Sequence, residues 1–380
     1  MNADPSFTIG IEEEYLLVER ESRDLAAEPP PEMLAECEAR LSGRVMPEFL
    51  QSQIEVATGI CTSLAQARSE LAGLRAGVAA VADRHGLAPI AAGTHPFALW
   101  TRQKTTALER YHGIDRDMAA VARRLVICGL HVHVGIEDDD LRIDLMNQVS
   151  YFLPHLLALS TSSPFWQGQE TGLMSYRLSI FDSLPRTGLP DRFESFGEYQ
   201  RLVRRLIKAG LIDDAGKLWW DVRPSARFPT LEMRITDVCT RLEDAITIAA
   251  LFRSLLAMLY RLKQRNQRWR LYANALVQEN RWLAQRHGSD GALADFGKGA
   301  RFPFPDLLEE LIELAREEAV AFGCWPEVLK ARDILARGTS AHRQIALYRA
   351  AQAEGASPEA ALRQVVDWLI AETQAGCSPA

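Results

Sequence analysis

Three consecutive glutamates interrupt an otherwise strand-like stretch, FTIGIEEEYLLV at residues 7–18. Side chains alternate between the two faces of a β-strand, so Glu12 and Glu14 share one face, while Glu13 shares the other with Ile11. Two carboxylates about 4 Å apart repel by roughly 4 kcal/mol at an effective dielectric constant near 20. Oxygen-rich sites of this kind select Mg²⁺ or Mn²⁺. We therefore predict that Glu12 and Glu14 bind a divalent metal ion.

Four further segments show the same alternation between an apolar face and a face with polar or ionisable groups. They are EFLQSQIEVAT (48–58), RLVICGLHVHVGI (124–136), GLMSYRLSIFD (172–182) and TLEMRITDVC (230–239). Their polar faces carry Glu55, His131, His133, Arg177, Glu232 and Arg234. Each polar face alone is also explained by solvation, or by an exposed ion pair worth little. Glutamate is depleted in strands, so its repeated appearance on such faces indicates a working surface.

The rest of the chain predicts what covers this sheet. Apolar residues recur at helical spacing in 63–85, in 241–287 and in the later segments PDLLEELIELAREEA and SPEAALRQVVDWLIAET. Residues 1–240 mix strands with helices, whereas 241–380 form a helical part without strands. Clean alternation favours an antiparallel sheet. We therefore predict a single α+β domain over 1–380, with helices on the outer, apolar face of the sheet and a helical C-terminal part.

Composition and charge exclude several classes of protein. The 380 residues carry a formal net charge of −7, which argues against nucleic-acid binding. The six cysteines form no CxxC pair, which fits reduced thiols in the cytoplasm. The start MNADPSFT has no signal-peptide pattern, and no run of about 18 apolar residues indicates a membrane span. We expect a cytoplasmic protein whose partners are small molecules, not nucleic acid or membrane.

Several arginines lie close to the predicted polar face. The sequence contains neither GxxxxGK[ST] nor GxGxxG, so a P-loop or a Rossmann site is not supported. Nucleotide phosphates could instead be held by metal ions and arginines, the usual electrostatic equipment of phosphoryl transfer. The available arginines are Arg177, Arg186, Arg223, Arg227 and Arg234.

The chain resembles the carboxylate–amine ligase family, also called glutamate–cysteine ligase type 2. The matching stretches run from residue 9 to about 291 and are IGIEEEYLLV, EFLQSQIEVATG, AAGTHPF, GLHVHVGI, SYRLSIFDSLPRTGLP, WWDVRPSARFPTLEMRITDVC and ENRWLAQRHGSDG. The resemblance implies an antiparallel sheet rolled into a funnel, as in glutamine synthetase and the guanidino kinases. It also implies that ATP is converted to ADP with Mg²⁺ or Mn²⁺, while a carboxylate becomes an acyl phosphate and then reacts with an amine.

The resemblance implies roles for individual residues. It makes Glu12 and Glu14 the metal-binding acids of a GIExE strand, and it adds metal ligands at Glu48, Glu55, His131 and Glu232. A spacing of seven cannot put Glu48 and Glu55 on one face of a regular strand, so Glu48 must precede the strand or a bulge must intervene. We assign the substrate carboxylate to Arg177 or Arg234, and the ATP phosphates to Arg186, Arg223 and Arg227.

Two other functions stay open on the sequence alone. His-x-His on a strand is also typical of amidohydrolases, although the later histidines, His155, His287 and His342, lie in helical patterns. A metal- or nucleotide-binding protein without catalysis is the second alternative. Family resemblance suggests glutamate-like carboxylates and cysteine, but the sequence names neither the carboxylate nor the amine. Oligomeric state is not readable either, although a homodimer is the commonest oligomer.

Overall fold

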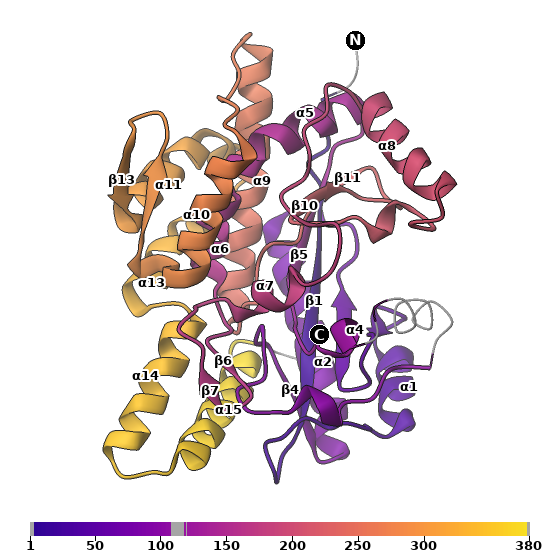
Figure 1. The fold of residues 1–380 in the computed structure, drawn as a ribbon, viewed down its shortest axis with the longest axis vertical. Coiled ribbons are helices and arrows are strands. Elements are labelled where there is room, and N and C mark those ends of the chain that lie inside the picture. Colours follow the sequence, from indigo (N-terminus) through magenta and orange to yellow (C-terminus); the bar gives the residue numbers. More distant parts are fainter. Residues whose placement is uncertain (1–3, 108–117, 119, 378–380) are drawn as a thin grey trace.

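Seven strands form one antiparallel sheet at the centre of the protein, seen here in a computed structural model that describes residues 4–107, 118 and 120–377. The strands are β1 (Ile9–Glu19), β2 (Val45–Pro47), β3 (Gln53–Ala57), β4 (Leu87–Ile90), β5 (Leu130–Gly135), β10 (Val222–Pro224) and β11 (Thr230–Met233). Their order is β10-β11-β5-β1-β3-β2, and β4 pairs with the far end of β1 (Figure 1). The predicted α+β fold with an antiparallel sheet is confirmed.

Two long helices cover the apolar face of the sheet. They are α2 (Leu64–Arg84) and α9 (Leu242–Gln264), which pack against β1 and against each other. Ser63 caps α2 by accepting a hydrogen bond from the Gln66 amide at 3.2 Å, the arrangement expected of a serine at the first helical boundary. The predicted helix over 63–85 is therefore confirmed, and 241–287 forms two helices, the second being α10 (Asn274–His287).

Helix α9 is the one described helix that is long and apolar enough to cross a membrane by length and composition. However, 83% of its most apolar 18-residue window is buried inside the protein, as in the core helix of a globular fold. Its apolar surface is therefore explained by packing against the sheet and the C-terminal helices.

The C-terminal part is mostly helical and shares its core with the sheet (Figure 1). Its helices after α10 are α11 (Phe304–Ala321), α12 (Trp325–Leu329), α13 (Ala331–Arg337), α14 (Ser340–Ala353) and α15 (Pro358–Gln374). The prediction that this part contains no strands is wrong, because β12 (Ala292–Asp295) and β13 (Ala300–Pro303) form a short hairpin. The Asp295 side chain accepts bonds from the amides of Gly297 and Lys298 and so shapes the turn between them.

The remaining elements connect these layers. The helices are α1 (Pro31–Arg40), α4 (Ala120–Arg123), α5 (Asp139–Val149), α6 (Leu153–Ser160), α7 (Tyr176–Phe181) and α8 (Phe196–Lys208). The short strand pairs are β6 (Phe165–Trp166) with β7 (Gln169–Glu170), and β8 (Thr187–Gly188) with β9 (Trp219–Trp220).

The prediction of a strand over 172–182 is wrong, because this segment contains the short helix α7. Tertiary hydrogen bonds fix its start. The amides of Tyr176 and Arg177 donate to the carbonyl and the hydroxyl of Ser163, at 2.9 and 3.0 Å. A six-residue helix shows less than two full turns of periodicity, so alternating residues alone could not separate it from a strand.

The central strand buries an acid on its apolar face. Glu13 is fully buried and forms a bidentate ion pair with Arg75 of α2, with N–O distances of 2.6 and 2.8 Å. The Tyr15 hydroxyl donates a further bond to the same carboxylate. Glu13 therefore faces the helices, whereas Glu12 and Glu14 face the opposite side, as the alternation predicted.

Replacing Glu13 with Gln should lower the free energy of unfolding by about 3 kcal/mol, because the buried Arg75 guanidinium then lacks its counter-charge. Chemical denaturation measures the change. The matched control is Glu309→Gln, which removes an exposed carboxylate from its pair with Arg332 and should cost less than about 1 kcal/mol. Equal losses of unfolding free energy in the two variants would show that burial does not explain the contribution of the Glu13–Arg75 pair to stability.

Candidate functional site

Strand register brings the polar residues together on the open face of the sheet. Glu12 of β1 lies opposite His131 of β5, and Glu14 lies opposite Glu55 of β3. One strand further, Glu232 of β11 lies opposite His133 and also opposite Arg223 of β10. Directly opposed side chains on antiparallel strands approach to about 5 Å. Five strands thus contribute to one row of charged and imidazole groups.

These residues line a cavity of about 580 Å³. One wall is acidic and is made by β1 and β3, and the other is basic and is made by β10, β11 and α7. The lining includes Glu12, Glu14, Glu48, Glu55, His131, His133, Arg177, Arg223, Arg227, Glu232 and Arg234. The structure thus brings together every predicted site residue except Arg186.

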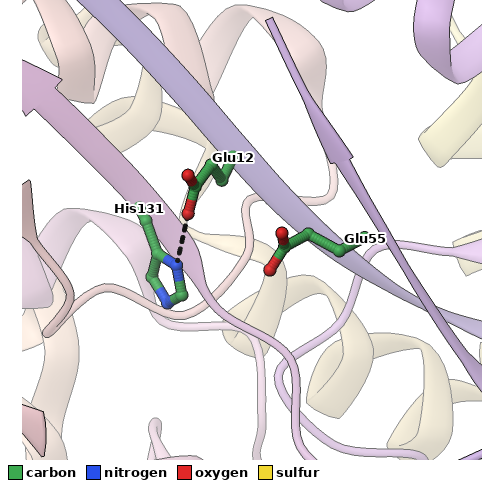
Figure 2. Close-up of side chains that lie close together, drawn as sticks. All are labelled: Glu12, Glu55 and His131. Carbon is green, nitrogen blue, oxygen red and sulfur yellow. Dashed lines mark hydrogen bonds and ion pairs between the residues drawn. The ribbon is translucent and has the colours of Figure 1, made fainter. Parts of the chain in front are cut away.

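The acidic wall contains groups of side chains that could hold a metal ion. Glu12, Glu55 and His131 each place one ligand atom within 4.8 Å of the others (Figure 2). Glu14, Glu48 and Glu55 form a second such group, and Glu12, His133 and Glu232 form a third. Carboxylate oxygens with one imidazole suit Mg²⁺ or Mn²⁺ better than a soft-ligand metal.

Crowding of the carboxylates changes the pKa values of two of them. Burial raises the pKa of the Glu55 carboxyl well above its usual value, and the charges of Glu48, Glu12 and Glu14 add to this effect. Burial also raises the pKa of Glu14, although the amide of Gly129 donates a hydrogen bond of 2.6 Å to it. A divalent cation would relieve this repulsion, so the donor set and its charge fit such an ion.

Glu48 lies between β2 and β3: it follows directly on Pro47, where β2 ends, and precedes Gln53, where β3 begins. This position explains how Glu48 and Glu55, seven residues apart, can meet in one group without a bulge. The first of the two geometric alternatives drawn from the sequence is therefore confirmed.

The two histidines of β5 differ in their surroundings. Burial and the nearby Arg234 guanidinium lower the pKa of His131, which keeps its imidazole neutral and able to act as a ligand. Burial also disfavours charge on His133, but its hydrogen bond to Glu12 and the charges of Glu232 and Glu12 together raise its pKa. The Nε2 atom of His133 lies 3.3 Å from Glu12 Oε1, and that of His131 lies 3.8 Å from Glu14 Oε1. The sequence analysis did not propose His133 as a site residue, although its alternation placed it on this face.

The basic wall is organised around Glu232. Arg223 binds its two oxygens at 2.9 and 3.1 Å, and Arg234 forms a second, short ion pair with it. Burial alone would raise the pKa of Glu232, but the two guanidinium groups hold it well below its usual value. Glu232 therefore fixes two cations beside the acidic wall, with only β5 between its strand and that of Glu12.

Arg177 differs from Arg75 and Arg281, the two arginines that are still more deeply buried. Arg75 and Arg281 are each 1% exposed, and each binds carboxylates, Glu13 for the first and both Asp182 and Asp221 for the second. Arg177 is 2% exposed, yet no carboxylate within the described ranges lies within 4.0 Å of its guanidinium. Its Nη atoms reach only the carbonyls of residues 234 and 235, at 3.3–3.4 Å, and its Nε has no partner there.

Two of the predicted phosphate-binding arginines lie away from this centre. Arg227 is exposed at the rim of the cavity, in the turn between β10 and β11. Arg186 lines a neighbouring cavity of about 370 Å³, where it donates to the Lys217 carbonyl and lies over the Trp219 ring. Since Trp219 also lines the acidic cavity, the two spaces share this wall.

A buried network behind the basic wall was missed by the sequence analysis. Asp237 is fully buried and accepts hydrogen bonds from the amide of Ser162 and from the hydroxyls of Ser163 and Ser175. Ser163 in turn accepts from the amide of Arg177. The aspartate in RITDVC follows an apolar alternation and gives no local signal of this role, because its partners come from distant segments.

Comparisons with known proteins agree over the whole chain. The model of the glutamate-cysteine ligase family 2 matches residues 8–364. A Rhodospirillum rubrum protein is 61% identical over 376 residues, which cover 98% of this chain and 97% of that protein. A Jannaschia sp. protein is 55% identical over 368 residues, with 97% of each chain covered. Both are provisionally named glutamate–cysteine ligase 2.

Solved structures share the fold at low sequence identity. A glutamate–cysteine ligase from Francisella tularensis, in complex with AMP, gives a TM-score of 0.68 at 14% identity and covers 98% of this chain and 90% of its own. A bifunctional glutathione synthetase from Pasteurella multocida gives 0.67 at 16% identity, over 97% of this chain and 53% of its own. Because the family model spans nearly all of the sequence, the chain belongs to the glutamate-cysteine ligase family 2.

Proposed function

We propose that this protein is a cytoplasmic, ATP-dependent carboxylate–amine ligase that forms an amide through an acyl phosphate. The proposal rests on one observation: the carboxylates of the acidic wall and the arginines of the basic wall line the same cavity. This arrangement can hold both a metal–nucleotide complex and a second, anionic substrate. Family membership supports the reaction class, and the AMP in the Francisella tularensis structure supports nucleotide binding on this fold.

Mg²⁺ or Mn²⁺ would be held by Glu12, Glu14, Glu48 and Glu55 of the acidic wall, by His131 of β5 and by Glu232 of the basic wall. Bound there, the metal would supply positive charge for the phosphates of ATP. Glu232 holds Arg223 and Arg234 in place through ion pairs. The two guanidinium groups would therefore not need to move as negative charge develops on the transferred phosphoryl group, and such preorganised groups lower the activation barrier. We assign Arg227 at the rim, and Arg186 in the neighbouring cavity beyond Trp219, to the outer parts of the nucleotide.

Arg177 is our candidate for the substrate carboxylate, with Arg234 as the second candidate. A guanidinium buried without a carboxylate is costly, whereas a bidentate pair with a bound carboxylate satisfies it. The carboxylate oxygen so held would attack the γ-phosphorus in line, and the amine would then displace phosphate from the acyl group. Glutamate and cysteine are the substrates that family membership suggests first, and a glutamate-like carboxylate fits the charge of Arg177.

The amidohydrolase alternative loses support from the cavity itself. Among the described residues, only His131 and His133 contribute imidazoles to its lining, and His155, His287 and His342 do not. Hydrolases of that class need further histidines from later strands.

The proposed function is tested by ADP release with Mg²⁺ over a panel of carboxylates that includes L-glutamate, with hydroxylamine in place of the amine. An acyl phosphate reacts with hydroxylamine, so we expect a hydroxamate in proportion to ADP. Addition of EDTA should abolish both products. ADP without hydroxamate for every active carboxylate would contradict the acyl phosphate, and full turnover in metal-free buffer would contradict the metal assignment.

Replacing Glu12 or Glu14 with Gln should reduce turnover on the order of 10²-fold or more, because each loses a charge that the metal needs. The fold should survive, since either change relieves repulsion among the carboxylates. Glu13→Gln is the matched control on the same strand: at a temperature where it stays folded, its metal-dependent turnover should remain close to that of the unchanged protein. Loss of turnover in Glu13→Gln with activity kept in Glu12→Gln would show that the faces of β1 are assigned wrongly.

The two histidines of β5 should not be equivalent. We expect His131→Ala to lose more activity and more Mn²⁺ affinity than His133→Ala, because His131 is neutral and belongs to the group with Glu12 and Glu55. Steady-state kinetics and Mn²⁺ titrations followed by electron paramagnetic resonance compare the two variants. Equal losses, or the reverse order, would count against His131 as the ligand.

A further inference from the structure

The guanidinium of Arg177 lies against Gly129, where a residue with a Cβ atom would collide with it. A Cβ atom added to Gly129 would lie 2.4 Å from Arg177 Nη2 and 2.9 Å from its Cζ, both far inside normal contact distances. The third-nearest atom is the Nε of the same side chain, at 3.2 Å. The space beside Gly129 is therefore occupied by one guanidinium group.

The backbone conformation does not explain this glycine. Gly129 is not among the residues whose φ lies in the left-handed region, so an L-residue could adopt its backbone angles. Its main chain is held in place from two sides. Its amide donates to Glu14 Oε2 at 2.6 Å, its carbonyl accepts from the Glu14 amide at 3.2 Å, and it pairs with Asp237 in an isolated antiparallel bridge.

The other end of Arg177 is fixed independently. Asp237 binds the hydroxyls of Ser163 and Ser175, and these residues hold the first turn of α7, where Arg177 lies. The start of the side chain is thus anchored by α7, and its end is confined between Gly129 and the carbonyls of residues 234 and 235.

We infer that Gly129 is a positioning residue for Arg177: the absence of its side chain sets where the guanidinium meets the substrate carboxylate. This inference rests on the proposed function, in which Arg177 binds that carboxylate. A methyl group at residue 129 would displace the flexible end of one side chain and no backbone atom, so the change moves the guanidinium while leaving its chemistry and the fold intact.

Gly129→Ala tests the inference, with Gly10→Ala as the matched control. Gly10 also lies on this face of the sheet, but a Cβ there would meet only the Cβ of His133, at an ordinary 3.6 Å. With L-glutamate, hydroxylamine and ATP, Gly129→Ala should raise the KM for L-glutamate on the order of 10-fold or more, the scale of one lost charged hydrogen bond. The KM for ATP and the melting temperature should stay close to those of the unchanged protein, and Gly10→Ala should change none of the three.

A double-mutant cycle shows whether the effect passes through Arg177. In an Arg177→Ala background the atoms that the methyl group would meet are absent, so Gly129→Ala should add little to the loss already present. Additive effects of the two changes would overturn the inference. So would an unchanged KM for L-glutamate in Gly129→Ala, or equal increases in the KM values for L-glutamate and ATP.

A structural readout separates this inference from the proposed function. If the unchanged protein forms no ADP with any carboxylate, the proposed ligase activity fails on that result alone. A crystal structure of Gly129→Ala then decides the placement: a guanidinium of Arg177 that has left the carbonyls of residues 234 and 235 supports the positioning role, and one that keeps both contacts overturns it.

Discussion

Repulsion among half-buried carboxylates is the constraint on which this structure depends. Glu12, Glu14, Glu48 and Glu55 meet on one wall of a cavity whose floor is the face of a sheet, and burial makes their charges costly. The protein offsets this cost locally with two histidines on the neighbouring strand and with a row of arginines one strand further away. The register of the antiparallel strands places an acidic wall opposite a basic wall. The same cavity can therefore accept both a cation and an anionic nucleotide.

The sequence was most informative where side chains alternate along long strands. The eleven residues of β1 separate Glu13 from Glu12 and Glu14 without ambiguity, and the structure places the first against α2 and the other two in the cavity. The motif HVH on β5 likewise puts both imidazoles on the polar face. Helical spacing of apolar residues also made α2 and α9 predictable, because this signal is local.

Prediction failed where tertiary contacts decide the local structure. The helix α7 has six residues and depends on hydrogen bonds to Ser163, which lies twelve or more residues earlier in the chain. Arg186 was grouped with the other arginines because it belongs to a matching motif, yet the turn after α7 directs it to the other side of Trp219. The roles of Asp237 and Gly129 were invisible for the same reason, since their partners come from several separate segments.

The buried pair between Glu13 and Arg75 also links the two ends of the chain. The Arg75 guanidinium donates to the carbonyls of residues 239 and 240, beyond the last strand of the sheet, and to the carbonyl of Thr373 in α15. During synthesis on the ribosome, β1 leaves the exit tunnel well before α15, so the Arg75 guanidinium gains the Thr373 carbonyl as a partner only when α15 has emerged. The buried pair behind the row of glutamates is therefore complete only after the chain between β1 and α15 has been made.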